Sequence, residues 1–173
     1  VPAEAAEQIA RRLLAHAQVE PVGLGARDSL RLEAGLCLYG HELSPEIGPV
    51  QARLTWSVAK ARRSGGARAG GFPGAEVILA NMPDQSPMCR VGLKGESKRP
   101  LRDAQAVFDV DGREVGEISS AAYGASVGGP IAMAFVERGV AAPGTQLSVA
   151  SRDKRIPATV VALPFIPPRY HRG

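Results

Sequence analysis

The sequence has few of the residue types on which metal centres and disulfide frameworks depend. Its 173 residues include only two cysteines and three histidines, and aromatic residues make up 5%. Cys37 and Cys89 show no metal-ligand spacing, which argues against a zinc site. Two thiols in a chain of intracellular character are more often reduced and buried than joined in a disulfide. The histidines, His16, His41 and His171, are scattered along the chain. This spacing argues against a histidine-based metal site.

Long apolar runs and concentrated charge are also missing. No apolar run approaches the roughly 20 residues that a membrane-spanning helix needs. The chain opens without a basic stretch followed by an apolar one, so nothing reads as a secretion signal. The net charge of +4 is spread out, and the densest basic patch, between Lys60 and Arg68, has glycines but no interleaved aromatics. Membrane and nucleic-acid binding are therefore disfavoured, whereas an anionic ligand or an acidic partner would suit the charge.

The chain does contain enough apolar residues for a real core. Hydrophobic residues make up 45% of the sequence, which suits one domain or one and a part. With so few aromatics, this core must consist mainly of alanine, valine, leucine and isoleucine. The charged fraction of 22% is ordinary for a globular protein.

The first 60 residues read as helices with one strand. An apolar stripe predicts an amphipathic helix over 3–17, which we expect to cover a sheet whose larger part is not in this chain. Glycines flank a second, shorter helix over about 26–34. Alternation over 50–58 predicts a strand with Leu54, Trp56 and Val58 on one face.

A glycine-rich basic segment, 60–71, predicts a flexible, solvated linker, and a short helix follows over 72–80. Beyond residue 88 the chain changes to short apolar runs broken by turn signals. This pattern is typical of a small β-barrel or sandwich. We expect a tight hairpin at Asp111-Gly112 and another turn at Pro143-Gly144. The six runs are 88–94, 105–110, 113–120, 130–137, 145–150 and 156–163.

Two arginines stand out in the apolar segment from Gly23 to Gly40. Arg27 and Arg31 are four residues apart and so lie on the same helix face, beside a leucine-rich wall. Such an arrangement is costly unless anions meet the guanidinium groups. The alternative is a solvated helix face on which Asp28 and Glu33 are the partners.

The same segment resembles a signature of a known family. ARDSLRLEAGLCLYGHEL, followed in order by GPVQARLTWSV, FPGAEVIL, RVGL, DGREVGEISS, IAMAFV, PGTQLSV and LPFIPPRY, resembles the glycine cleavage system T-protein. The resemblance covers only the C-terminal part of that family. It implies an α+β fold, in which part of an α/β (ferredoxin-like) middle domain precedes a small antiparallel C-terminal β-barrel. The implied division is 1–60 for the end of the folate-binding middle domain, 61–84 for a linker with a short helix, and 85–173 for the barrel domain with its tail.

The resemblance also implies a function. T-proteins are tetrahydrofolate-dependent aminomethyltransferases. They transfer a methylene group from an aminomethyl-lipoyl carrier protein, the H-protein, to tetrahydrofolate, and they work in the bacterial cytoplasm or the mitochondrial matrix. The implied co-substrate is tetrahydrofolate, with no metal. Because the N-terminal part of the family pattern is missing, we expect the 173-residue chain alone to be inactive.

Two other functions remain open. One is a folate-dependent demethylase or dimethylglycine-oxidase-type module, although those relatives diverge around RDSLRLEAGL. The other is a non-enzymatic binding fragment, which the missing catalytic half would explain.

By motif match, two positions in this chain would contact the substrate: Arg27, in Ala-Arg-Asp, and Tyr170, after the proline-rich tail. We expect the apolar tail residues to dock and to bring Tyr170 against Arg27. Arg31 and Arg102 are secondary candidates, for which a structural ion pair is the alternative. The family's catalytic acidic residue has no counterpart here, so no catalytic residue is assigned. The family's loop pattern also changes over 119–129, where this chain has Ser119, Ser120, Ala121, Gly124 and Ala125.

Overall fold

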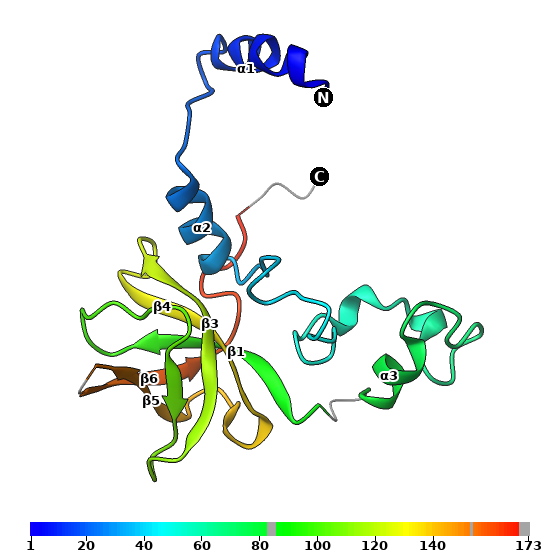
Figure 1. Cartoon of the computed structure of the whole chain (residues 1–173), viewed down its shortest axis with the longest axis vertical. Helices are drawn as coiled ribbons and strands as arrows, with labels where there is room; N and C mark the ends of the chain where they lie inside the picture. Colours follow the sequence, from blue (N-terminus) through cyan, green and yellow to red (C-terminus); the bar gives the residue numbers. More distant parts are fainter. Residues whose placement is uncertain (83–85, 153, 170–173) are drawn as a thin grey trace.

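The computed structural model describes residues 1–82, 86–152 and 154–169. A β-barrel occupies the second half of the chain, and helices and loops precede it (Figure 1). Within the described ranges the α-helices are α1 (Ala6–Leu14), α2 (Leu24–Glu33) and α3 (Ala75–Ala80). Short 3₁₀ turns occur at Ala3–Ala5, Thr55–Ser57, Lys60–Arg62 and Arg138–Val140.

Six antiparallel strands close into the barrel. They are β1 (Met88–Gly95), β2 (Ala106–Phe108), β3 (Glu114–Gly124), β4 (Gly129–Glu137), β5 (Gln146–Ser151) and β6 (Lys154–Val161). Their order around the barrel is β1-β4-β3-β2-β5-β6, and β6 pairs back onto β1 from Gly92↔Val161 to Gly95↔Ala158. Each of the six apolar runs became one strand, so the predicted α+β fold with a C-terminal barrel is confirmed.

The predicted turns are also present. Asp111-Gly112 links β2 to β3, and Gly112 has a φ of 86°, a left-handed conformation that glycine adopts without strain. At Pro143-Gly144 the chain turns again before β5, with a φ of 94° at Gly144.

The main core fills the barrel. Its side chains are almost all branched aliphatic residues or alanine, as the scarcity of aromatic residues predicted. Every strand contributes to it, for example with Leu93, Val107, Ile118, Val136, Val149 and Val160. Leu101 and Ala141, in the connections between strands, complete this core.

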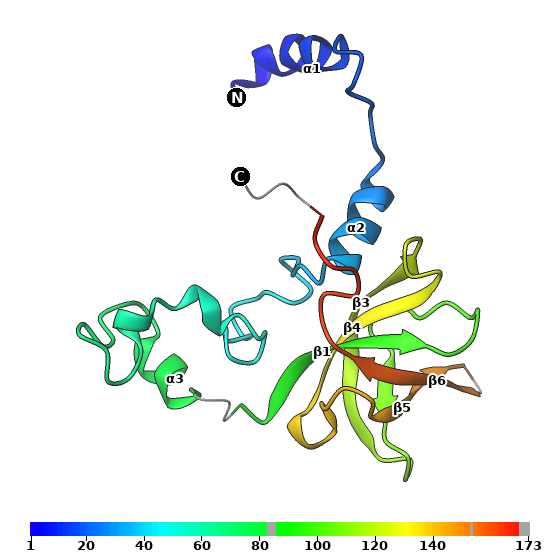
Figure 2. The same ribbon diagram turned by 180° about the vertical axis from the view of Figure 1, so that it is seen from behind.

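A smaller apolar cluster holds α2 and the C-terminal tail against the outside of the barrel. Leu32 of α2 packs with Ile131 and Met133 of β4, and Leu163 and Phe165 of the tail pack against them. The Ile166 amide donates to the Glu33 carbonyl at 3.1 Å. Figure 2 shows the tail passing beside α2. The expected docking of the apolar tail residues is therefore confirmed.

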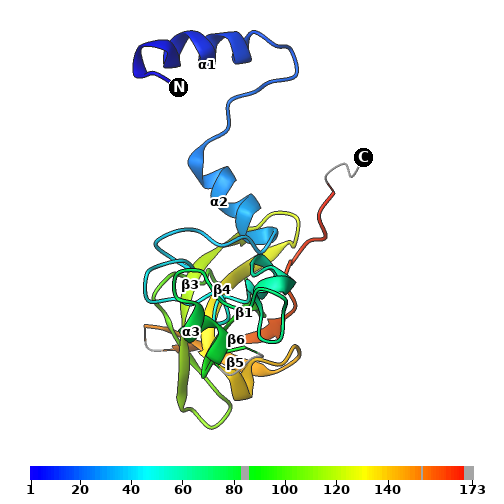
Figure 3. The ribbon, with the colours of Figure 1, turned by 90° about the vertical axis from the view of Figure 1, so that its right-hand side faces the viewer.

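Helix α1 lies apart from the barrel. It has no buried residue, and its apolar side chains are open to solvent, Leu13 at 59%. Figures 1 and 3 show a long connection between α1 and α2. Before β1 the described residues form no strand, only an isolated bridge between Tyr39 and Leu43. The sheet that α1 was expected to cover is thus not present in the described chain.

The strand predicted over 50–58 is wrong. The segment forms turns and the 3₁₀ turn Thr55–Ser57, and Trp56 is 77% exposed. Arg53 has a φ of 56°, which interrupts any extended backbone. Within this segment, the Gln51 carbonyl accepts a hydrogen bond from the backbone amide of Arg90 at 2.9 Å. Alternation alone predicted a strand for which no partner strand exists in the described chain.

The basic segment 60–71 is folded on itself. Arg63 donates to the carbonyls of Thr55 at 2.7 Å and Val58 at 3.0 Å, and Arg62 donates to that of Gly70 at 3.1 Å. These two guanidinium groups are half-buried, so the prediction of a solvated segment is wrong for them. None of the described helices is both long and apolar enough to cross a membrane.

Candidate functional site

The candidate site is organised by the end of α2. Gly35 follows the helix with a φ of 65°, its amide bonds the Leu32 carbonyl at 2.8 Å, and the Leu36 amide bonds the Arg31 carbonyl at 2.9 Å. This pair of bonds is the Schellman motif, which ends a helix at a left-handed glycine. A Cβ on Gly35 would approach Leu163 and Pro164 at 3.3 Å. The same glycine therefore ends the helix and lets the tail pass close by.

The two arginines of α2 have different surroundings. The Arg31 side chain is 10% exposed and forms ion pairs with Asp28 at 3.1 Å and Glu42 at 2.9 Å. The Arg27 side chain is 52% exposed, and its contact with Asp28 is longer, 3.8 Å. Anions do meet Arg31, as predicted, whereas Arg27 keeps most of its donors available. Of the alternative partners, Asp28 is correct, but Glu33 is buried and accepts from the Ser126 amide at 2.7 Å.

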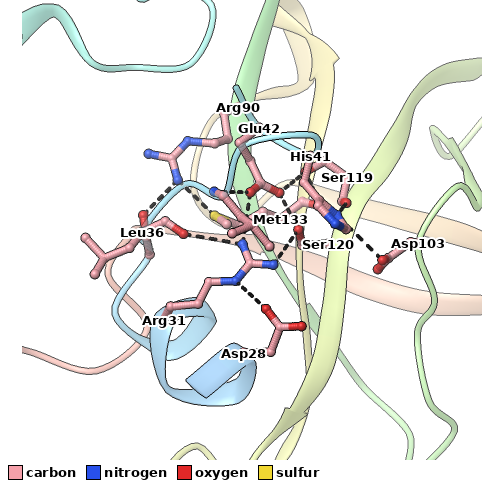
Figure 4. A network of polar contacts seen from close by, with 12 residues as sticks. Asp28, Arg31, Leu36, His41, Glu42, Arg90, Asp103, Ser119, Ser120 and Met133 are labelled. Atoms are coloured by element: carbon pink, nitrogen blue, oxygen red, sulfur yellow. Dashed lines mark hydrogen bonds and ion pairs between the residues drawn. The ribbon is translucent and has the colours of Figure 1, made fainter. Parts of the chain in front are cut away.

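Glu42 is the centre of the polar network (Figure 4). Its side chain is completely buried. One carboxylate oxygen accepts from the hydroxyls of Ser119 and Ser120, each at 2.6 Å, and the other accepts from Arg31 at 2.9 Å and the Leu38 amide at 3.0 Å. Arg31 also donates to the Ser120 hydroxyl at 2.9 Å. The network thus joins α2, the loop after it and strand β3.

A β-bulge explains how two consecutive serines reach one carboxylate. Successive strand residues normally point to opposite faces of a sheet. The pairing of β3 with β4 shifts between Ile118 and Ser120, which leaves Ser119 as the extra residue. A bulge of this kind turns a side chain away from its regular direction. Both hydroxyls can therefore face Glu42.

Arg90 of β1 makes a second link between the barrel and the preceding loops. Its guanidinium donates to the carbonyls of Ala52 at 2.9 Å and Gly35 at 2.8 Å, and it also contacts the Met133 sulfur. Burial lowers the pKa of Arg90 from its ordinary value, because the charged form loses hydration. Burial raises the pKa of the nearby Cys37 thiol, because it disfavours the charged thiolate in the same way. Both cysteines are free thiols, as predicted, with Cys89 buried and Cys37 partly so.

A cavity of about 440 Å³ lies beside the network. The Nδ1–H group of His41 donates to the Ser119 carbonyl oxygen at 2.8 Å, and Nδ1 lies 3.7 Å from an Asp103 carboxylate oxygen. The residues that line this cavity include Gly40, His41, Gln51, Asp103, Glu117, Ser119 and Phe135. Carboxylates and an imidazole therefore border the side of the network away from α2.

The other predicted site residues lie elsewhere or outside the described ranges. Arg102 lines a separate cavity of about 510 Å³ formed by the β1–β2 connection and the β5–β6 hairpin, together with Arg99, Arg152 and Lys154. The structure does not bring Arg102 into the α2 network. Tyr170 lies outside the described residues, so its expected place against Arg27 stays a prediction.

Sequence reasoning missed the residues that hold α2 in place: Glu42, Ser119, Ser120 and Arg90. A signal existed for Glu42, an acidic residue within the mostly apolar segment 36–43. No sequence pattern marked the bulge that brings the two serines together.

Comparison with known proteins agrees with this architecture. The family model of the glycine cleavage T-protein C-terminal barrel domain matches residues 89–166, and that of the GCVT N-terminal domain matches residues 1–62. The chain belongs to the glycine cleavage T-protein family. The two matched segments contain the two sides of the Arg31–Glu42–Ser120 network.

Individual relatives agree with the family. The chain is 43% identical to the mitochondrial aminomethyltransferase of Gallus gallus over 99% of this chain, and 40% identical to that of Flaveria trinervia. The crystal structure of glycine cleavage system aminomethyltransferase T from Bartonella henselae superposes with a TM-score of 0.90 at 40% identity, covering 99% of this chain and 46% of that one. The chain spans about 42% of the length of these two curated relatives.

Proposed function

We propose that this chain is the C-terminal part of an aminomethyltransferase of the glycine cleavage system. The observation that carries the proposal is identity of about 40% to aminomethyltransferases over 99% of the chain. In this proposal 1–60 belong to the end of the folate-binding domain, 61–84 connect, and 85–173 are the barrel domain with its tail. The proposed localisation is the bacterial cytoplasm or the mitochondrial matrix. Relatives that are named mitochondrial support the matrix.

The proposed reaction moves one carbon from a lipoyl carrier protein to tetrahydrofolate. Folate nitrogens attack the methylene carbon, ammonia leaves, and the carbon–sulfur bond to the lipoyl arm breaks. The products are 5,10-methylenetetrahydrofolate, ammonia and the reduced lipoyl arm. Because the reactants supply the nucleophile and the leaving groups, the protein's contribution is positioning and electrostatic stabilisation.

Arg27 is the residue we assign to folate binding in this chain. Its planar guanidinium carries five donors that fit a carboxylate or the edge of a pterin. Its half-exposed position and single long ion pair leave donors free for a ligand. Arg31, by contrast, is engaged by Asp28 and Glu42, which suits a structural role.

Tyr170 is the second proposed folate contact. Its ring would pack against the ligand, and its hydroxyl would form a hydrogen bond at the solvent-exposed edge of the site. The docked residues Phe165 and Ile166 support this role, because they fix the chain a few residues before Tyr170. Deleting 169–173 from the whole protein should raise the KM for tetrahydrofolate and leave the melting temperature nearly unchanged.

The test of the proposal is Arg27→Lys in the whole protein that contains this chain. Formation of 5,10-methylenetetrahydrofolate would be followed with the aminomethyl-loaded lipoyl carrier. Lysine keeps the charge but loses the bidentate fork, so kcat/KM should fall by roughly 5- to 150-fold, equivalent to about 1–3 kcal/mol. Arg12→Lys on the exposed face of α1 is the matched control and should change nothing. Unchanged kinetics with a lowered melting temperature would make Arg27 structural.

The same assay tests whether the chain acts alone. The 173-residue chain should show no turnover, because in this proposal most of the folate pocket belongs to the rest of the protein. Turnover near that of the whole protein would overturn this expectation. Absence of transfer by the whole protein would overturn the proposed function itself.

A further inference from the structure

The buried Glu42 carboxylate has a feature that stability alone does not require. Burying an ion pair such as Arg31–Glu42 costs desolvation energy, and well-packed apolar residues often give equal or greater stability. Here the carboxylate is completely buried and all four of its hydrogen bonds are made. In some proteins such pairs are retained because they fix the geometry of the parts that they join.

The parts joined are a short helix and the barrel. Helix α2 has ten residues, and its only buried side chains are Leu32 and Glu33, in its last turn. Leu24 and Leu30 are 76% and 61% exposed. One buried leucine attaches the end of the helix but does not fix its rotation about its own axis. Polar contacts must therefore supply that constraint.

Arg31 transmits the constraint toward the start of the helix. It is anchored to β3 through Glu42 and Ser120, and its Nε holds Asp28 at 3.1 Å. Asp28 in turn lies 3.8 Å from Arg27. Because Arg27 and Arg31 lie one turn apart on the same face, the rotation that seats Arg31 also sets the direction of Arg27. A further bond, from Ser29 to the Tyr123 carbonyl at 3.0 Å, supports the same orientation.

We propose that Glu42 is a positioning residue for Arg27. Through Arg31 and Asp28, the carboxylate fixes the rotation of α2 on the barrel, so that the Arg27 guanidinium faces the ligand with its donors free. This role rests on the proposed function of Arg27 in folate binding. The bulge at Ser119 contributes to this positioning, since it provides two hydroxyl donors to Glu42 where a regular strand would provide one.

The first arm of the test is kinetic and uses Glu42→Gln in the whole protein. The amide has the shape of the carboxylate but leaves Arg31 without its buried anion. We expect the KM for tetrahydrofolate to rise about tenfold and kcat to change by less than about threefold. Glu137→Gln, which neutralises one of the two carboxylates paired with Arg113 on the barrel surface, is the matched control and should leave both constants unchanged. Glu42→Asp keeps the charge, so the KM for tetrahydrofolate should rise much less in this variant than in Glu42→Gln.

A double variant separates positioning from general stability. If Glu42 acts through Arg27, Glu42→Gln should raise KM by less than about twofold in an Arg27→Lys background. Equal factors in both backgrounds would overturn the proposal, as would a lowered melting temperature with unchanged KM. Should Glu42→Gln fail to fold, Ser120→Ala removes one donor and keeps the ion pair. It should then raise KM about twofold to threefold, and an unchanged KM would overturn the proposal.

The second arm does not depend on activity. Amide hydrogen exchange over Leu24–Glu33 should be faster in Glu42→Gln than in the parent protein and unchanged in Glu137→Gln. Equal exchange in all three proteins would overturn the positioning role. If the whole protein transfers no aminomethyl group but α2 exchange responds as expected, the proposed function fails while Glu42 still orients the helix.

Discussion

The barrel and the helical segments before it are stabilised in different ways. In the barrel, six strands enclose a continuous apolar core, and both edges of the sheet are paired because the sheet closes. The preceding segments have α1 without a buried residue and α2 with two. They are attached by the buried apolar residues Leu32, Val50 and Ala52 and by buried polar groups, above all Glu42 and Arg90. One part is held by hydrophobic burial and the other largely by specific hydrogen bonds.

This difference separates stability from orientation. Hydrophobic burial is strong but non-directional, so it specifies that surfaces meet more than how they are turned. Hydrogen bonds and ion pairs depend on geometry and contribute less net stability. The barrel therefore serves as a rigid support, and the polar contacts set the direction in which α2 presents Arg27.

The largest expected effect comes from matched leucine deletions in the two parts. Leu93→Ala removes a fully buried barrel side chain and should lower the free energy of unfolding by about 4 kcal/mol. Leu13→Ala on α1, which is 59% exposed, should change it by less than about 0.5 kcal/mol. Denaturant unfolding of the 173-residue chain measures both values. Similar losses would mean that α1 is covered and that the contrast is false.

A smaller effect is expected at the polar attachment. Arg90→Met keeps much of the side-chain volume but removes the bonds to the carbonyls of Gly35 and Ala52, and should cost about 2–3 kcal/mol. Arg113→Met on the barrel surface is the control and should leave the unfolding midpoint unchanged, since exposed ion pairs contribute little. If the two substitutions had equal effects on the midpoint, Arg90 would not be an attachment.

The smallest expected effect is a pH dependence at Cys37. Burial raises the pKa of this thiol in the folded state, so the neutral form is favoured there. The unfolded chain then loses the thiol proton first, and stability falls as the pH rises above about 8.5 toward the folded-state pKa. Between pH 7 and 10 the melting temperature should therefore fall slightly more in the parent chain than in Cys37→Ala. Identical slopes would contradict the raised pKa.

The barrel was predictable because its signals are local. Apolar runs of strand length and glycine turns such as Asp111-Gly112 specify strands and hairpins from neighbouring residues alone. The short helix ending before Gly35 was predictable for the same reason. The alternation over 50–58 misled, because a strand also requires a partner strand, and a sequence window does not contain that information.

The network around α2 could be predicted only in part. The cost of placing Arg27 and Arg31 beside an apolar wall predicted that anions would meet them. Asp28 was expected as a partner only in the alternative, a solvated helix face. Glu42 is an equally important partner, but it reaches Arg31 through a loop whose path depends on Arg90 and β3. Such contacts depend on the bulge at Ser119 and on tertiary packing, which no periodicity encodes.

Hydrogen exchange on the 173-residue chain tests the contrast between the two parts most directly. The account predicts slow exchange for paired amides of β1–β6 and rapid exchange for Ala6–Leu14. It predicts intermediate exchange for Leu24–Glu33, since that helix buries side chains only in its last turn. Equal protection of Ala6–Leu14 and the barrel strands would contradict the account, because it would show that the N-terminal helix is stabilised as strongly as the closed sheet.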